Sequence, residues 1–505
     1  MKKNFLALLI IAVIFTVIIT ACSRNNNWNP TELRYGYTTE PKTLDPLNPD
    51  NTADGRSILF NVFEGLVKPD TDGTFLPCLA ESWTIERNAL VYNFTLREDV
   101  FFHDGSVLKI EDVKFSLETA IQAGFIGLYL IEEVIILGER NIIVSLKTPN
   151  PDFLPYMTVG IIKADNTDRE KNAIGTGPFY IESYTPQRNL VLKKFENYWQ
   201  RFLPQPQEIP YLEKVIITFY ANNNALMISL RSGSIDGARL TGSSVAQLDH
   251  RHFDILHDYS SAVQLLALNN AKPPLDDIRV RKAINYGIDV QGIIDTAFFG
   301  LGSHSGSPII PGLSAYYESS LGYSYDPETS IALLAEAGLN NSKKVTLEIT
   351  VPSNYTMHVD TAQVIVNQLE KIGIEATIKL VDWPTWLSDV YRNRNYEATI
   401  ISIDSPVVSP RSFLARYHST DSNNFINFTN NNFDNVYNAL LTEINSAART
   451  RLVREAQRII SDNAASVFIQ DILYYNVFRK DSYAGVKNYP LYVIDFSTIY
   501  GINKN

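Results

Sequence analysis

The sequence is poor in the residues that most often build catalytic or metal sites. Two cysteines, Cys22 and Cys78, and seven histidines occur among 505 residues. No cysteine–histidine set has the spacing of a structural zinc site, and no phosphate loop or dinucleotide fingerprint occurs. Residues 302–306 resemble a nucleophile elbow, but His304 occupies the place of the nucleophile. We therefore expect a protein that is not an enzyme, with no metal site and no cofactor.

Clustered positive charge and long apolar runs are also scarce. The formal net charge is −11, whereas nucleic-acid-binding surfaces need a basic stripe. We therefore expect no nucleic-acid partner. Beyond residue 22 no apolar run reaches the ~18 residues of a membrane-spanning candidate, so we expect no transmembrane helix there.

The N-terminus, by contrast, carries a clear targeting pattern. Lys2 and Lys3 precede an apolar stretch at 5–19, and small residues lead to Cys22. This is the order of a secretory signal, and its about 15 apolar residues fall short of the ~20 that span a bilayer. A cysteine directly after the cut resembles the bacterial lipobox. We expect removal of 1–21, acylation of Cys22 (a palmitate-type anchor) and a flexible tether after it.

Cys22, once acylated, cannot form a disulfide. Cys78 then has no intramolecular partner, and we expect it to be a small buried side chain. The 484 residues left after residue 21 exceed one ordinary core and predict two or three lobes.

Hydrophobic periodicity predicts alternating strands and helices, most clearly after residue 269. This alternation is typical of an α/β protein with parallel strands crossed over by helices. The expected helices are 57–66, 111–120, 222–232, 279–286, 327–337, 361–372 and one that opens at Pro384, and the expected strands are 33–37, 90–96, 141–147, 180–181, 190–192, 215–220, 263–268, 345–351, 374–380 and 396–403.

A set of short motifs follows in order from about residue 32 to the end. They are EPKTLDP at 40–46, FEGL at 63–66, LAESW at 79–83, FTLR at 94–97, HDG at 103–105, EDV at 111–113, GTGPF at 175–179, NYW at 197–199, RVRKAI at 279–284, ID at 288–289, YDPE at 325–328 and LLAEAG at 333–338. Each motif is weak alone, but the ordered set is specific. Together they resemble the bacterial extracellular solute-binding proteins of family 5, which serve peptide and nickel importers.

The resemblance implies an architecture. Members have an α/β fold of the type II periplasmic-binding-protein kind, with two main lobes, a hinge and an inserted third lobe. The implied division is lobe I at 23–68, 173–268 and 471–505, inserted lobe II at 69–172, and lobe III at 269–470. The implied hinge strands lie near 266–270 and 469–475.

The resemblance also implies a function. Such proteins close two lobes around a ligand and deliver it to the permease of an ABC importer. We expect a monomeric, lipid-anchored binding protein outside the cytoplasm, in the periplasm or at the cell surface, with short peptides as ligand. A nickel chelate, haem or an oligosaccharide on the same fold stays open, as does an adhesion or signalling lipoprotein.

Four residues are implied to contact the ligand by their place in the motif order. Asp404, at the end of a predicted strand, aligns with the aspartate that anchors a peptide's α-ammonium group; otherwise it begins a turn into Pro406. Asn51, Thr52 and Ala53 occupy the stretch that lines the pocket from lobe I.

Three further positions match the family less well. His358 stands where some oligopeptide binders place a histidine that contacts a carboxylate, and otherwise it is a surface residue at a helix start. Ile401 replaces a frequent tryptophan. Arg411 lies near the position of a nickel-binding histidine; it cannot bind nickel, but it could hold a ligand carboxylate through two hydrogen bonds.

Overall fold

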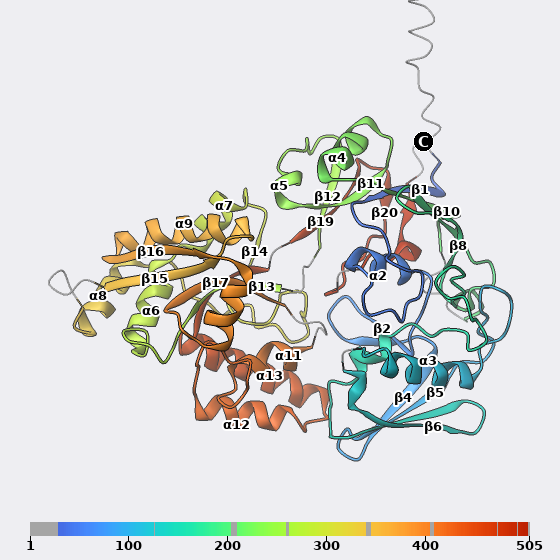
Figure 1. Ribbon diagram of the computed structural model, residues 1–505, viewed down its shortest axis with the longest axis horizontal. Helices are drawn as coiled ribbons and strands as arrows, with labels where there is room; N and C mark the ends of the chain where they lie inside the picture. The colour runs from blue at the N-terminus through green and yellow to red at the C-terminus, as the bar shows by residue number, and fades with distance from the viewer. Residues whose placement is uncertain are drawn as a thin grey trace, which may run out of the picture.

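The computed structural model describes residues 29–125, 127–203, 210–258, 262–339, 345–404, 409–471, 473–491 and 493–502. Figure 1 shows three lobes, with the N-terminal and C-terminal segments together in one of them. Cys22 and the expected tether up to residue 28 lie outside the described residues. Within the described part of the chain, no helix has both the length and the apolar character needed to cross a bilayer.

Lobe I is built on a mixed seven-stranded sheet in the order β12-β19-β11-β1-β10-β9-β8. Strand β1 lies parallel to both β10 and β11, and the other pairs are antiparallel. Its elements are β1 (Glu32–Tyr37), α2 (Ala53–Leu59), β8 (Phe179–Thr185), β9 (Asn189–Lys194), η3 (Trp199–Phe202), β10 (Lys214–Phe219), α4 (Asn223–Ser232), β11 (Gly237–Thr241), α5 (Gly242–Val245), β12 (Phe253–Asp258), β19 (Tyr474–Arg479), β20 (Tyr483–Ala484), η6 (Phe496–Thr498) and β21 (Tyr500–Gly501).

The inserted lobe II is a four-stranded antiparallel sheet in the order β4-β5-β7-β6, with one helix against it. Strand β7 alternates between half-buried and buried residues, so Ile142, Val144 and Leu146 form one apolar face. Its elements are β2 (Val67–Pro69), β3 (Phe75–Pro77), β4 (Ala80–Glu86), β5 (Val91–Leu96), α3 (Ile110–Gln122), η1 (Leu128–Leu130), β6 (Ile131–Leu137), β7 (Asn141–Leu146) and η2 (Leu154–Thr158).

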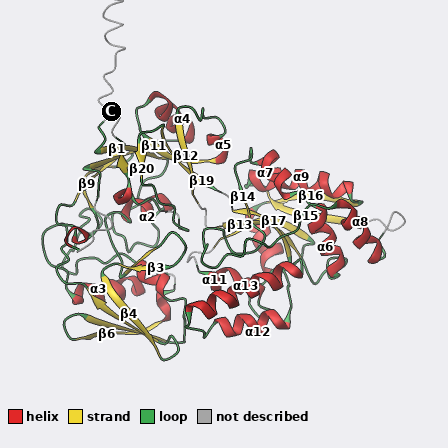
Figure 2. Ribbon diagram, turned by 180° about the vertical axis from the view of Figure 1, so that it is seen from behind, coloured by secondary structure: helices red, strands yellow, loops and turns green. Residues whose placement is uncertain are grey.

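Lobe III is a six-stranded sheet in the order β14-β18-β13-β17-β15-β16, with helices on both faces (Figure 2). Helices α6 and α9 cover one buried face, and α12 and α13 cover the other. Its elements are β13 (Ala262–Leu268), α6 (Ile278–Gly287), α7 (Val290–Ala297), β14 (Ser303–His304), α8 (Pro327–Glu336), β15 (Val345–Pro352), α9 (Thr356–Lys371), β16 (Ile374–Val381), α10 (Trp383–Thr385), η4 (Trp386–Arg392), β17 (Ala398–Asp404), α11 (Pro410–Leu414), η5 (Ala415–Tyr417), α12 (Asn431–Leu440), α13 (Ser446–Asp462) and β18 (Ser466–Asp471).

The strand pairing corrects the expected boundary between lobes I and III. Strand β13 pairs with β17 and β18, so residues 262–268 belong to lobe III, although the sequence placed them in lobe I. The chain passes from β12 to β13 between Asp258 and Ala262, and it returns from β18 to β19 between Asp471 and Tyr474. The expected hinge at 469–475 brackets the second passage, whereas 266–270 lies inside lobe III.

Two other expectations were wrong. The helix expected at 57–66 is α2 at Ala53–Leu59, because Thr52 caps it by accepting the Gly55 N–H. Both large sheets are mixed: in lobe III, β15 runs parallel to β16 and β17, but β13 runs antiparallel to β17 and β18.

The buried apolar side chains are divided unevenly among the lobes. One continuous cluster extends from lobe I into lobe II, joining Tyr35 and Phe179 to Tyr92 and Phe94. Lobe III has two clusters of its own, one on each face of its sheet. Because close-packed interiors transmit displacement, lobes I and II form one body, and lobe III is the part that can turn against it.

The buried carboxylate of Glu64 joins the two lobe I segments that flank the inserted lobe. It accepts hydrogen bonds from the Tyr198 hydroxyl (2.8 Å), the Trp199 indole N–H (3.0 and 3.2 Å) and the Thr176 hydroxyl (2.9 Å). The thiol of Cys78 lies 3.5 Å from the same carboxylate, and Cys78 is buried as expected. Burial raises the pKa of Glu64, while the three hydrogen bonds act to lower it. Three of the motifs, FEGL, GTGPF and NYW, thus meet at one side chain.

A second set of contacts ties the inserted lobe to lobe III. Asp152 and Arg449 form an ion pair of 2.7 Å, with side chains only 9% and 8% exposed. Arg449 also donates to the backbone carbonyls of Leu440 and Glu443 at 3.0 and 2.9 Å. A buried charge pair is costly to split, because either partner left alone remains desolvated. Rotation of lobe III must therefore pivot around this contact or break it.

Replacing Glu64 with alanine should destabilise the protein by about 3 kcal/mol, because the buried hydroxyl and indole donors then have no acceptor. Urea unfolding measures the change. Glu118→Ala is the control, because Glu118 forms only an exposed pair with Lys114 on α3; we expect under about 0.5 kcal/mol there. Equal losses in the two variants would contradict a connecting role for Glu64.

Replacing Asp152 with alanine should loosen lobe II from lobe III, because Arg449 loses its carboxylate. We expect a broader distance distribution between spin labels at the exposed positions 132 and 438, measured by double electron–electron resonance. Arg458→Gln, in an exposed pair on α13, should leave the distribution unchanged. An unaltered distribution in Asp152→Ala would show that the ion pair does not restrain the lobes.

Candidate functional site

The lobe I residues predicted to line the site use their polar side chains for hydrogen bonds within their own loop. The Asn51 amide accepts the Lys42 N–H at 2.9 Å and donates to the carbonyls of Thr43 and Asp45 at 3.0 and 3.4 Å. The Thr52 hydroxyl caps α2 and donates to the Glu40 carbonyl at 3.0 Å. These side chains therefore shape the loop, and Ala53 is the exposed member of the three.

The lobe III residues predicted on β17 differ from each other. Asp404 is the last residue of β17, and its backbone pairs with Ala262, the first residue after the chain enters lobe III. Its side chain lies outside the described residues. Ile401 is 6% exposed and packs in the core on the α12–α13 face. It therefore fills the interior of lobe III, where it cannot line a ligand surface as the expected tryptophan would.

His358 belongs to a buried polar network at the start of α9. Its side chain is 2% exposed, which excludes the surface histidine considered from the sequence. The Gln264 amide donates to His358 Nδ1 at 3.0 Å and to the Thr361 hydroxyl at 3.1 Å, and it accepts from the Gln470 amide at 2.9 Å. Burial lowers the pKa of His358 to about 4, so the ring is neutral near pH 7.

The network lies beside both passages between the lobes. Gln264 is the third residue of β13 and pairs with Gln470, which is the penultimate residue of β18. Each strand adjoins one passage. The network therefore stiffens lobe III at the point where the chain enters and leaves it, and the sequence pattern did not indicate this.

Arg411, predicted near a ligand carboxylate, instead contacts the inserted lobe. Its guanidinium donates to Asn150 Oδ1 at 2.7 Å, and it also contacts the Tyr437 hydroxyl. In this structure Arg411 is part of the contact between lobes II and III, next to the Asp152–Arg449 pair.

A polar group in lobe I lies where the chain returns from lobe III, and two of its members, Tyr474 and Arg239, were missed from the sequence. Tyr474, the first residue of β19, is close enough to Arg239 and Asp54 for both charges to act on its hydroxyl. Burial raises the Tyr474 pKa, the Arg239 charge lowers it and the Asp54 charge raises it. Asp54 accepts a hydrogen bond from the Thr39 hydroxyl, and Arg239 donates to the Val493 carbonyl at 2.9 Å.

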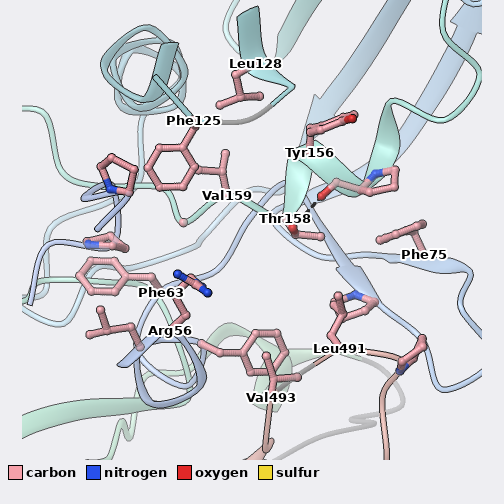
Figure 3. A pocket seen from close by; sticks show the side chains of 18 of the residues that line it. Arg56, Phe63, Phe75, Phe125, Leu128, Tyr156, Thr158, Val159, Leu491 and Val493 are labelled. Carbon is pink, nitrogen blue, oxygen red and sulfur yellow. Dashed lines mark hydrogen bonds between the residues drawn. The ribbon is translucent and has the colours of Figure 1, made fainter. Parts of the chain in front are cut away.

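A cavity of about 400 Å³ lies between α2 and the inserted lobe, and it was also missed (Figure 3). Its wall is formed by described residues from α2 and the loops on either side of it, from the inserted lobe and from the C-terminal segment, among them Phe60, Phe63, Phe125, Tyr156 and Val493. Arg56 is the one charged side chain among the described lining residues. The apolar residues Phe60 and Phe63 lie in the segment that the sequence analysis assigned to a helix at 57–66.

The described histidine, cysteine and acidic side chains do not gather in any group of three that could hold a metal ion. The arrangement favours binding a small solute between mobile bodies.

Comparison with known proteins decides the family. The model of bacterial extracellular solute-binding proteins, family 5 middle region, matches residues 74–425. The chain belongs to this family. Its members are extracellular binding proteins, as the ordered motifs indicated.

Relatives of this solute-binding protein extend over most of the chain. Heme-binding protein A of Haemophilus influenzae is 26% identical over 77% of each chain. Glutathione-binding protein GsiB of Salmonella typhimurium is 25% identical over 83% of this chain and 84% of its own. The unliganded open form of MppA, a periplasmic murein tripeptide binding protein, superposes with a TM-score of 0.85 at 19% identity, covering 94% of this chain and 98% of that one. This likeness confirms the type II periplasmic-binding-protein fold.

The pH dependence of stability tests the buried state of His358. The pKa of His358 is about 4 in the folded protein, whereas its ordinary value is 6.5. Its contribution to the free energy of unfolding is therefore complete above pH 6.5 and is lost as the pH falls through 4. Between pH 7 and 4, the free energy of unfolding should fall by ~3 kcal/mol more in wild type than in His358→Gln. Urea unfolding at pH 7, 5.5 and 4 measures the difference.

Glutamine is chosen because its carbonyl can still accept from Gln264. His250→Gln, exposed in a turn, is the control and should keep the wild-type pH dependence. If the free energy of unfolding changes with pH in the same way in wild type and in His358→Gln, His358 is not buried as described.

Proposed function

We propose that this protein is the lipid-anchored binding subunit of an ABC importer and that it holds a short peptide between lobe I and lobe III. The observation that carries this is the division of the molecule into two bodies with separate buried clusters, joined where the chain passes through 259–261 and 472. Hinge closure around a ligand uses this arrangement, because a few residues absorb the dihedral change.

Asp404 is the proposed anchor for the α-ammonium group of the peptide. It ends β17 in the middle of the lobe III sheet, opposite the first residue after the passage from lobe I. A carboxylate there is in the part of lobe III closest along the chain to lobe I. Acylation of Cys22 supplies the proposed membrane anchor, and the permease is the proposed partner of the closed form, with the protein itself a monomer.

Peptides are favoured among the solutes of the relatives. GsiB is named for glutathione and MppA for a murein tripeptide, and both ligands are peptide-like. Heme-binding protein A is named for haem, so haem, like a nickel chelate or an oligosaccharide, is the alternative cargo. Mass spectrometry of the protein purified under native conditions separates these cargoes: a series of short peptides supports the proposal, and a haem, metal or sugar mass overturns the peptide assignment.

Replacing Asp404 with alanine should weaken peptide binding at least tenfold, because the buried ammonium loses its counter-charge. Isothermal titration calorimetry measures the affinity for a peptide recovered from the purified protein. Asp360→Ala, an exposed aspartate on α9, is the matched control and should bind as wild type does. Unchanged affinity in Asp404→Ala, with the fold intact by circular dichroism, would remove Asp404 from the site.

A further inference from the structure

The cavity between α2 and the inserted lobe has the properties of a ligand site. Its about 400 Å³ falls within the range of pockets that hold small molecules. The hollow is partly open to solvent, and Arg56, which lines it, is exposed, so a solute can reach it.

The wall of the cavity is mostly apolar, and Arg56 is its one charged side chain among the described lining residues. Aromatic rings line it from both lobes: Phe60 and Phe63 from lobe I, and Phe75, Phe125 and Tyr156 from the inserted lobe. Aromatic surfaces of this kind bind another ring by offset or edge-to-face contact. The ring-lined, mostly apolar wall therefore suits an aromatic group.

Arg56 is the exception in this wall. One of its N–H groups is used: Nη1 donates to the Asn51 carbonyl at 2.5 Å, which holds the guanidinium at the start of α2. The other guanidinium donors form the fork that pairs with a carboxylate through two hydrogen bonds. Figure 3 shows Arg56 among the apolar side chains that surround the cavity. No acidic side chain lies among the described lining residues to neutralise it.

We propose that this cavity binds an aromatic carboxylate, with the ring among the phenylalanines and the carboxylate on Arg56. Where the ligand is a peptide, which rests on the function proposed above, the group bound here is a bulky aromatic residue at its carboxyl end. The cavity then selects the side chain, and Asp404 serves the opposite, amino end.

The test uses N-acetyl-L-phenylalanine as the probe, with N-acetyl-L-phenylalanine amide as its uncharged match. The acid should bind the wild-type protein with measurable heat, and Arg56→Gln should weaken it at least tenfold. Arg56→Lys should keep part of the affinity, because lysine carries the positive charge but lacks the paired N–H donors of the guanidinium. The amide should bind more weakly than the acid and should not respond to Arg56→Gln.

Two further variants separate the cavity from the general charge of the surface. Val159→Trp fills the cavity from the inserted lobe and should abolish binding of the acid and the amide alike. Arg451→Gln removes an exposed arginine from α13 and should leave both affinities unchanged. Thermal unfolding of each variant checks the fold, and Arg56, being exposed on α2, remains a usable test if Val159→Trp does not fold.

The outcomes distinguish this proposal from the proposed function. Equal binding of the acid by wild type and Arg56→Gln, or no binding at millimolar concentration, overturns the cavity proposal even if peptides bind through Asp404. Arg56-dependent binding of the acid supports the cavity proposal even if no peptide binds, in which case the peptide function alone fails.

Discussion

The buried carboxylate of Glu64 is the interaction on which the arrangement of lobes I and II depends. A carboxylate moved out of water is strongly disfavoured unless donors surround it, and here the hydroxyls of Tyr198 and Thr176 and the indole of Trp199 do so. Those donors come from segments more than 100 residues further along the chain. Satisfying one carboxylate therefore holds together the two lobe I segments from which the inserted lobe extends.

Because lobes I and II pack as one body, lobe III is the part of the molecule that can move. The shared cluster makes lobes I and II one body, while lobe III is attached through two passages and through the Asp152–Arg449 contact. The network of Gln264 and Gln470 stiffens lobe III beside the passages. The ion pair lies away from them on the inserted lobe and limits the directions in which lobe III can turn.

Local sequence signals predicted the elements whose formation is local. Helix α4 was found with its ends, because Asn222 caps it and Gly233 adopts the left-handed conformation that ends it. Strand β16 was found from its alternation. The family resemblance supplied the lobes. The predictions that were wrong concern residues whose place depends on distant partners. Strand β13 belongs to lobe III because it pairs with β17, over 130 residues later, and no local pattern encodes that pairing. Arg411 contacts Asn150 for the same reason.

The C-terminal segment connects features that otherwise seem separate. Val493 lines the cavity, and its carbonyl accepts a hydrogen bond from Arg239, which acts on Tyr474 at the passage back from lobe III. Leu491 lines the same cavity and packs against a buried cluster of lobe III. A group that fills the cavity therefore presses on a segment that already touches the moving lobe. An occupant of the proposed site would contact Leu491, which packs against lobe III, so its binding energy would depend on the position of lobe III and could bias closure.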